Sequence, residues 1–465
     1  MDPPFNQKSP PLKGDLGGCS HEDRGNERGK GHQAPDTLPF RVEVTPGYQE
    51  AFDALDAGSP LVFITGRAGT GKSTFIHYFR HVTDKRTAVV APTGVAALNA
   101  GGQTVHSFFR LPPRVIDPKN IGRVRGRTMY EKLEVLVIDE ASMVRADVLD
   151  GIDRFLRING LDPHAPFGGV QLVLVGDLFQ LPPVAVAEER RLLEEMGYKT
   201  PYFFHARCMR TLRPAFIELT KIYRQENANF IELLNNIREK KDVEATIEEI
   251  NRRCCNEYGD IDTDGMIMLT CTNYSAGRMN TYRLNGIEET EKRFEGEIQG
   301  EFNLENEKLP SPQVLILKPG ARVMFTKNDA QGRWVNGTPG EVIGFDHDMI
   351  QVRTGRDMVD VERTVWEKVE YAYDEDSDCI VADVAGMYIQ FPLMLAWAIT
   401  IHKSQGKTLR NVYIDLGRGA FETGQLYVAL SRCPALEDIT LHRPITAADV
   451  KMDGEVVKWH EGMRG

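Results

Sequence analysis

The chain of 465 residues, 41% hydrophobic and 26% charged, is long enough to fold as two or three domains with separate cores. It contains no apolar stretch near the roughly 20 residues that span a bilayer and no apolar N-terminal signal, so we expect an intracellular, cytoplasmic protein with no membrane partner. Its seven cysteines form no C-x-x-C pair, which argues against a zinc site or a disulfide framework. The formal charge of −11 excludes little, because an acidic protein can still bind a polyanion in a narrow basic channel.

The first part of the chain predicts a tail followed by a parallel sheet. Residues 1–36 are rich in Gly, Pro and charged residues and lack apolar periodicity, which predicts a disordered tail. Continuous apolar runs then alternate with turn signals and helix-like stretches, at 61–64, 88–90, 135–138 and 170–175. Such runs are typical of strands buried on both faces of a parallel sheet. We expect a first α/β domain over residues 37–213.

The second part predicts another α/β domain with a β insertion. A helix-rich stretch over 214–251 precedes further buried-strand candidates at 266–270, 395–401 and 412–416. Between them, short alternating segments over 340–388 indicate a small antiparallel sheet. We therefore expect a second α/β domain made of 214–339 and 389–445, interrupted by this insertion, and a C-terminal tail over 446–465.

A glycine-rich loop follows the first predicted strand and opens a helix. It matches G-x-x-x-x-G-K-[ST] from Gly66 to Ser73. In such a loop the backbone N–H groups surround phosphate oxygens, the lysine reaches the β and γ phosphates, and the hydroxyl ligates magnesium. The bare pattern also occurs by chance in glycine-rich turns, but the strand-loop-helix context favours a nucleotide site. The predicted nucleotide-binding residues here are Gly66, Gly69, Thr70, Gly71, Lys72 and Ser73.

Two carboxylates, Asp139 and Glu140, end the third apolar run. An Asp-Glu pair alone is more often a solvated turn, but carboxylates that follow a buried strand face the edge of the sheet where α/β proteins bind ligands. We expect Asp139 to hold Mg²⁺ together with Ser73, and Glu140 to orient and deprotonate the attacking water. The predicted cofactors are therefore ATP and Mg²⁺.

A GTP-binding enzyme is an alternative for a chain with this loop. The stretch from Thr326 to Asp329 resembles the guanine-reading [NT]-K-x-D element. However, it lies far beyond the first predicted sheet, and no D-x-x-G follows a strand at the magnesium position. No G-x-G-x-x-G occurs, so a dinucleotide enzyme has no support.

Six further stretches follow in a fixed order. They are APTGVAA from Ala91, GQTVHSF from Gly102, VGDLFQLPP from Val175, IYRQ from Ile222, TIHKSQGKT from Thr400 and QLYVALSR from Gln425. With the glycine-rich loop they resemble the helicase motifs of superfamily 1, and most closely the PIF (petite integration frequency) family of 5′-to-3′ DNA helicases, with RecD-like helicases as nearest relatives. The resemblance covers about residues 45–445.

The resemblance implies roles for individual residues. Gln49 resembles the glutamine that contacts adenine, Gln180 the γ-phosphate sensor, and Arg224 and Arg432 the two arginines that reach the γ-phosphate from the second domain. The implied catalytic residues are Lys72, Asp139, Glu140, Gln180, Arg224 and Arg432. The implied contacts to single-stranded DNA are Thr93, His106, Phe108, Thr272, Asn273, His402, Ser404 and Gln405, although Phe108 or Phe109 could equally pack in the core.

The resemblance also implies an architecture. It predicts two RecA-like domains (1A and 2A), an SH3-like 2B insertion over 340–388 and a short wedge, 1B, at about 108–130. The predicted wedge carries six basic residues and few acids, so we expect it either to contact DNA or to form a solvated face. Pro339 stands where family members often have Arg, which puts a nucleic-acid contact at that turn in doubt.

The implied function is an ATP-dependent 5′-to-3′ DNA helicase. We expect a monomer of the bacterial or phage type that acts on single-stranded, forked or structured DNA in replication, repair or recombination. The alternative is a DNA-binding motor subunit of a larger RecD-like nuclease or replication complex.

Overall fold

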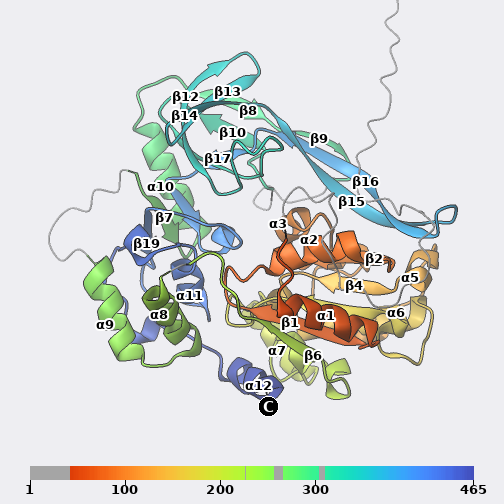
Figure 1. The fold of residues 1–465 in the computed structure, drawn as a ribbon. Coiled ribbons are helices and arrows are strands. Elements are labelled where there is room, and N and C mark those ends of the chain that lie inside the picture. Colours follow the sequence, from red (N-terminus) through yellow and green to blue (C-terminus); the bar gives the residue numbers. More distant parts are fainter. Residues whose placement is uncertain (1–41, 226, 256–264, 303–308, 465) are drawn as a thin grey trace, which may run out of the picture.

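The computed structural model describes residues 42–225, 227–255, 265–302 and 309–464, so the predicted disordered tail lies outside the described residues. The first domain is built on a six-stranded parallel sheet (Figure 1). In spatial order its strands are β3 (Gln103–Thr104), β2 (Thr87–Ala91), β4 (Val135–Ile138), β5 (Gln171–Val175), β1 (Leu61–Gly66) and β6 (Ala215–Leu219). The predicted parallel sheet is confirmed.

Both faces of this sheet are buried, as the continuous apolar runs predict. On β1, Val62 and Ile64 pack with α1 (Pro46–Asp56) and α2 (Lys72–Val82) in one core. Leu61 and Phe63 point to the other face and share a core with α6 (Ala146–Asn159). The shorter helices of this domain are α3 (Gly94–Asn99), α4 (Val105–Phe108), α5 (Thr128–Lys132) and α7 (Ala187–Glu195).

The second domain has a four-stranded parallel sheet of its own. Its strands in spatial order are β18 (Ala398–Thr400), β7 (Ile267–Thr270), β19 (Val412–Asp415) and β20 (Ile439–Leu441). The helices α8 (Ala228–Glu239), α9 (Val243–Cys254) and α11 (Gln425–Leu430) share one apolar core with this sheet, and α10 (Asn273–Asn285) lies against β18. Two parallel-sheet α/β domains are therefore present, as expected.

The boundary between these domains differs from the predicted one. We expected the second domain to begin at residue 214, but β6 pairs with β1 in the first sheet, with Ile217 opposite Ile64. The partly buried pattern of β6 is typical of an edge strand. The sequence pattern does not show which sheet it joins, which becomes clear only from its pairing with β1. The crossing to the second domain therefore follows β6.

The antiparallel insertion is present but larger than the predicted span of 340–388. A five-stranded sheet has the order β14 (Asp357–Val361), β13 (Met349–Thr354), β12 (Pro339–Asp346), β11 (Arg322–Phe325) and β17 (Leu393–Leu395). Two neighbouring strands of this sheet, β11 and the edge strand β17, lie in stretches that we assigned to the second α/β domain. The pattern of a short strand does not show which strand it pairs with. The further strands here are β8 (Lys292–Glu295), β9 (Glu297–Gly300) and β10 (Val314–Leu317).

A long hairpin of β15 (Thr364–Asp374) and β16 (Cys379–Gln390) leaves this insertion and reaches the first domain (Figure 1). The Tyr371 hydroxyl accepts a hydrogen bond of 3.1 Å from the backbone N–H of Val89. At the hairpin turn Asp378 forms an ion pair of 3.1 Å with Arg86. The insertion therefore contacts the first domain directly.

The predicted wedge is an irregular segment that packs on α6. Ile116 is buried, and its backbone N–H donates to the carboxylate of Asp147 at 2.7 Å. The backbone N–H of Val124 donates to Asn159 at 2.9 Å. Its exposed basic residues are Arg110, Arg114, Lys119, Arg123 and Arg125.

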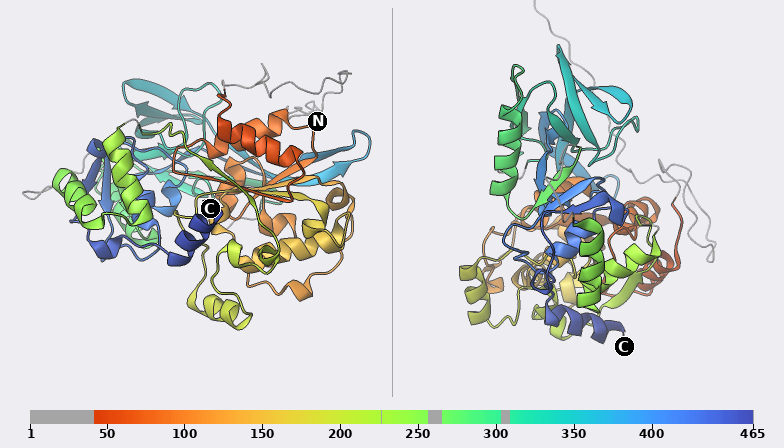
Figure 2. Two further views of the ribbon diagram at one scale, coloured as in Figure 1. Left: turned by 60° about the horizontal axis from the view of Figure 1, so that its bottom comes forward. Right: turned by 90° about the vertical axis from the view of Figure 1, so that its left-hand side faces the viewer.

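The C-terminal segment is not the tail that we expected over 446–465. It ends in helix α12 (Gly454–Arg464), which packs on the first domain although it follows the second (Figure 2). The ring of Trp459 lies 5.4 Å from that of Phe63 and 5.1 Å from that of Phe204. These contacts bury the apolar face of α12, which has too few apolar residues for the sequence pattern to predict a packed helix. Within the described residues, no helix combines the length and apolar character needed to cross a membrane.

We predict that Trp459→Ala lowers the free energy of unfolding by about 2 to 4 kcal/mol, because it opens a void among aromatic rings. Urea unfolding at neutral pH measures this. The control is Lys458→Ala on the same helix, whose side chain is 75% exposed and pairs only with Glu455. We expect less than about 0.5 kcal/mol for the control. Equal stability of the Trp459→Ala variant and the parent would show that α12 does not hold the two ends of the fold together.

Candidate active site

The glycine-rich loop runs from the end of β1 to the first residue of α2. Gly71 caps α2 in the left-handed region with φ 89°, and its carbonyl accepts a hydrogen bond of 2.7 Å from the hydroxyl of Tyr48 on α1. At Gly69, with φ 80°, a Cβ would lie 2.5 Å from Cβ of Arg224. Only glycine permits this approach, so the loop lies directly against the segment that carries Arg224.

The side chains of the loop are held by its own carbonyls. Nζ of Lys72 donates to the carbonyls of Gly66 at 2.7 Å and Arg67 at 3.0 Å. The hydroxyl of Thr70, which is buried, donates to Arg67 at 2.9 Å. Ser73 is exposed at the start of α2. The loop therefore has the strand-loop-helix geometry of a phosphate site.

The two carboxylates lie at the same edge of the sheet, after β4. The backbone N–H of Glu140 donates to Asp139 at 2.8 Å, and Glu140 stands in the left-handed region with φ 49°. Burial, and next the charge of Glu140, raises the pKa of Asp139 to about 7. Burial also raises the pKa of Glu140, although Lys72 and Arg432 oppose it. The charged forms of both carboxyl groups are therefore disfavoured at this edge unless a cation is bound beside them.

Two arginines, Arg432 buried and Arg224 half-buried, approach from the side of the second domain. The guanidinium of Arg432, which is 1% exposed, donates to the carbonyl of Val428 and the hydroxyl of Ser431, both at 2.9 Å. Arg224 donates to the carbonyl of Ser431 at 3.0 Å. In the described part of the chain neither has a carboxylate partner within ion-pair distance. Burial, and next the charge of Arg224, lowers the pKa of Arg432 to about 9. The pair therefore forms an unneutralised positive site.

Gln180 follows β5 and is nearly buried. Its amide donates to the carboxylate of Asp177 at 3.3 Å. Asp177 in turn forms an ion pair of 3.0 Å with Arg238, and both side chains are fully buried. Among the site residues predicted from the sequence, Gln180 is present, whereas Asp177 and Arg238 are not.

Gln49 and Tyr223 lie near the glycine-rich loop. The amide of Gln49 donates to Asp53 on its own helix at 2.8 Å. Tyr223 was missed, although it stands beside Arg224 in the same motif. Its backbone N–H donates to Gly69 at 2.8 Å, and its ring, at a residue 49% exposed, would lie 3.7 Å from a Cβ on Gly71.

The predicted nucleic-acid contacts fall at strand ends in both domains. Thr93 caps α3 after β2, and Thr272 caps α10 after β7, each through its own hydroxyl. Asn273 is exposed on the first turn of α10. His106 is half-buried on α4, and burial lowers the pKa of its imidazole. The two sheets thus present equivalent positions at their carboxyl edges.

The motif that begins at Thr400 contains one half-buried histidine and two residues with buried polar groups. His402 lies 3.2 Å from the carboxylate of Glu422. Nε2 of Gln405 is buried and has no hydrogen-bond partner among the described residues. Ser404 is fully buried, and its hydroxyl donates to the carbonyl of Ile401 at 2.6 Å.

Two predicted DNA contacts are corrected by burial. Ser404 cannot present its hydroxyl to a ligand, because that hydroxyl is enclosed and already bonded. Phe108 is 2% exposed, and its ring packs edge to face against Phe109, Tyr130 and Tyr371. Its aromatic face is covered by core side chains, so it is not available to stack on a base.

The comparisons with known proteins agree on one family. A family model described as PIF1-like helicase matches residues 48–248. The ATP-dependent DNA helicase Pif1 of Bdellovibrio bacteriovorus is 34% identical over 421 residues, which cover 86% of this chain and 88% of that protein. The mouse ATP-dependent DNA helicase PIF1 is 33% identical, but the match covers 87% of this chain and 60% of the longer mouse protein.

Solved structures of relatives match over nearly the whole fold. Bacteroides sp Pif1 in complex with ADP-AlF4 matches with a TM-score of 0.82 at 35% identity, over 91% of this chain and 98% of that chain. Bacteroides Pif1 bound to ssDNA matches with a TM-score of 0.65 at 35% identity, over 91% and 97% of the two chains. The loop, the carboxylates, the arginines and these similarities all lead to one conclusion: the chain belongs to the PIF1-like helicase family.

Proposed function

We propose that this chain hydrolyses ATP between its two parallel-sheet domains to move 5′ to 3′ along single-stranded DNA and unwind duplex or structured DNA. As a PIF1-like helicase it is an ATP-dependent DNA helicase. The observation that carries the proposal is a pair of arginines beside the loop that holds Lys72. Arg432 is buried and Arg224 half-buried, and in the described chain neither has a carboxylate partner within ion-pair distance. A polyphosphate bound there would supply the missing negative charge.

We propose the following roles for the site residues, on the basis of family membership and of their positions in the fold. Lys72 contacts the β and γ phosphates once these displace its bonds to the loop carbonyls. Gln180 senses the γ-phosphate, and Arg224 and Arg432 stabilise the charge that develops on it. Glu140, whose pKa burial raises, orients and deprotonates the attacking water. Tyr223 stacks on the adenine, and Gln49 contacts its edge after releasing Asp53.

The residues at the loop fit a magnesium ion. Within the described residues, no three His, Cys, Asp or Glu side chains cluster as a closed metal site. Mg²⁺ needs no such cluster, because it keeps several waters and binds phosphate oxygens. Ser73 and Asp139 would hold it: burial, and next the charge of Glu140, raises the pKa of Asp139, and a cation there would favour its ionised form. When bound, Mg²⁺ neutralises charge on the β and γ phosphates.

We propose that single-stranded DNA passes over the carboxyl edges of both sheets, in contact with Thr93, His106, Thr272, Asn273, His402 and Gln405. The ssDNA complex of Bacteroides Pif1 supports this partner. This chain matches the ADP-AlF4 complex of that relative better than the ssDNA complex, by TM-scores of 0.82 and 0.65, so its domains have the arrangement found without DNA. Direction rests on family membership.

We further propose that the free chain is a monomer inside the cell. The structure of forked dsDNA with two coordinating Pif1 helicases from Bacteroides supports a second copy at a fork. The motor residues are complete in one chain, so the activity does not require a larger complex.

The motor itself is tested with the purified chain. We predict that single-stranded DNA stimulates ATP hydrolysis by about tenfold or more, because Gln180 and the His402 segment connect the two sites. Partial duplexes with a 5′ tail should unwind, and those with a 3′ tail should not. DNA-independent hydrolysis would contradict the DNA motor, whereas unwinding from 3′ tails alone would contradict only the direction.

We predict different kinetic effects for the two sides of the phosphate site. Arg432→Ala should lower kcat by about 10³ while ATP affinity stays within about threefold, because its charge acts mainly on the transition state. Lys72→Ala should lower both kcat and the affinity for ATP. Nucleotide titration and DNA-stimulated turnover separate these effects, with exposed Arg252→Ala as the control. An Arg432→Ala variant that turns over within a few-fold of the parent would place this arginine outside the chemistry.

We predict that Glu140→Gln raises the melting temperature at pH 8 while it lowers kcat by about 10² or more. A carboxyl whose pKa is raised in the folded state costs stability once it ionises, and the neutral amide removes that cost. At pH 4, where the carboxyl is protonated in both states, the gain should disappear. Glu134→Gln, at an exposed ion pair with Arg86, serves as the control and should change neither property appreciably. A destabilised Glu140→Gln variant would show that the ionised carboxylate is well compensated.

A further inference from the structure

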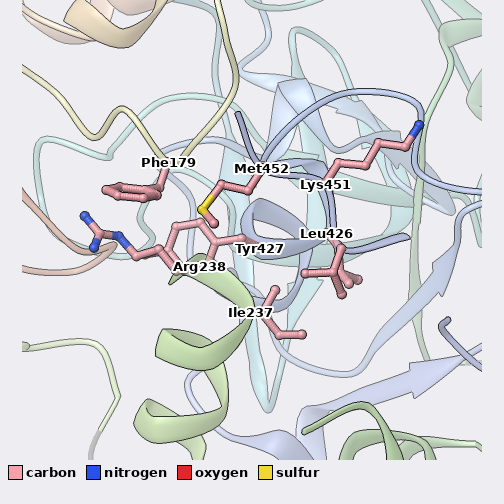
Figure 3. A pocket seen from close by; sticks show the side chains of 9 residues that line it. Phe179, Ile237, Arg238, Leu426, Tyr427, Lys451 and Met452 are labelled. Atoms are coloured by element: carbon pink, nitrogen blue, oxygen red, sulfur yellow. The ribbon is translucent and has the colours of Figure 1, made fainter. Parts of the chain in front are cut away.

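A fully buried ion pair joins the loop after β5 to the end of α8. Nη2 of Arg238 lies 3.0 Å from Oδ1 of Asp177, and neither side chain is exposed. The guanidinium carbon lies 4.0 Å from the centre of the Phe179 ring. Figure 3 shows Arg238 beside Phe179 and Tyr427, among the residues that line a small pocket.

Asp177 is the centre of a network that reaches both the γ-phosphate sensor and the glycine-rich loop. Its Oδ2 accepts from the amide of Gln180 at 3.3 Å and from the hydroxyl of Tyr427 at 3.4 Å. The same Tyr427 hydroxyl accepts from the backbone N–H of Ala68 in the loop at 3.1 Å. One carboxylate therefore fixes the sensor and, through Tyr427, the phosphate loop.

The network crosses from one domain to the other. Asp177 follows a strand of the first sheet, whereas Arg238 ends a helix whose apolar face packs in the core of the second domain. Tyr427 lies on α11, also in that core. Gly424, just before α11, lies close to the loop that follows β5 and carries Gln180, here called the sensor loop. A Cβ at Gly424 would be 2.4 Å from the carbonyl oxygens of Phe179 and Gln180. The second domain thus holds the sensor loop from two helices.

The pair is a costly way to hold two domains together. Two buried charges lose their hydration, and apolar side chains of similar volume are often as stable or more so. Nε and Nη1 of Arg238 also lack a hydrogen-bond partner in the described chain. What the pair provides and apolar packing does not is a fixed direction for the carboxylate that orients Gln180 and Tyr427.

We infer that Arg238 is a positioning residue for ATP hydrolysis: it holds Asp177, and through it Gln180 and the phosphate loop, in register with the second domain. The inference rests on the proposed ATPase motor. It means that the γ-phosphate sensor is aligned only when α8 is docked against the first domain, so the arrangement of the domains controls the chemistry without Arg238 touching the nucleotide.

The test compares kcat and KM for ATP in the presence of single-stranded DNA, with melting temperature as the check on folding. Arg238→Met should lower kcat by about 30-fold or more while KM stays within about threefold, and Arg238→Lys should recover part of kcat. Because Arg238→Met leaves Asp177 buried without its partner, it also lowers stability.

The decisive variant combines Arg238→Met with Asp177→Asn, which removes both charges. Its melting temperature should return close to that of the parent, whereas kcat should remain about tenfold or more below it. The control is Arg443→Met with Asp449→Asn, an ion pair of 2.9 Å within the second domain. Its carboxylate is 3% exposed, whereas its arginine side chain is 29% exposed. This control should leave kcat and KM within about twofold.

A neutral double variant with the parent's kcat would overturn the inference and leave the pair a structural feature. So would a fall in kcat for Arg238→Met that merely follows the fraction of folded protein. A parent without DNA-stimulated hydrolysis would instead overturn the proposed function, together with the inference that depends on it.

Discussion

The structure depends on buried charges that the two domains bring to one boundary. The first domain contributes Lys72, the carboxylates Asp139 and Glu140, and Asp177, while the second contributes the guanidinium groups of Arg224, Arg238 and Arg432. Burial makes each of them costly unless it is paired. Of these seven groups, only Asp177 and Arg238 form an ion pair with each other across the boundary in the described part of the chain. A bound nucleotide with its cation balances the other charges, so ligand binding and the arrangement of the domains affect the same free energy.

The fold elements that the sequence predicts well are those with a strong local pattern. The continuous apolar run of β1 and the glycines after it predict a strand, a loop and a helix, because burial on both faces and positive φ angles leave few alternatives. The strands at Val135 and Gln171 follow the same rule. For the candidate site, motif order identifies Gln180, Arg224 and Arg432, although no local pattern explains why an arginine is buried there.

The features that the sequence did not predict depend on pairing between distant residues. The partner of β6 is β1, more than a hundred residues earlier, and the partner of β11 is β17. Burial of Phe108 depends on Tyr371 in the hairpin, and burial of Ser404 on the packing around Arg432. A motif residue can point outward to a ligand or inward to its neighbours. Because the motif is the same in both cases, the sequence does not show which direction the side chain takes. For this reason the sequence does not predict that Asp177 and Arg238 form a buried ion pair.

The order of the chain also limits how the domains can move. The first domain is contacted by two segments that follow it: the hairpin, through Tyr371 and Asp378, and α12, through Trp459. The contacts at Asp378 are exposed ion pairs, which contribute little free energy and are sensitive to salt, whereas α12 is packed among aromatic rings. A rearrangement on DNA that releases the hairpin would therefore lose little at Asp378, but it would also separate Tyr371 from Val89 and from the ring of Phe108. The two parallel-sheet domains are joined at the segment after β6 and again through α12, whose aromatic packing makes its release costly.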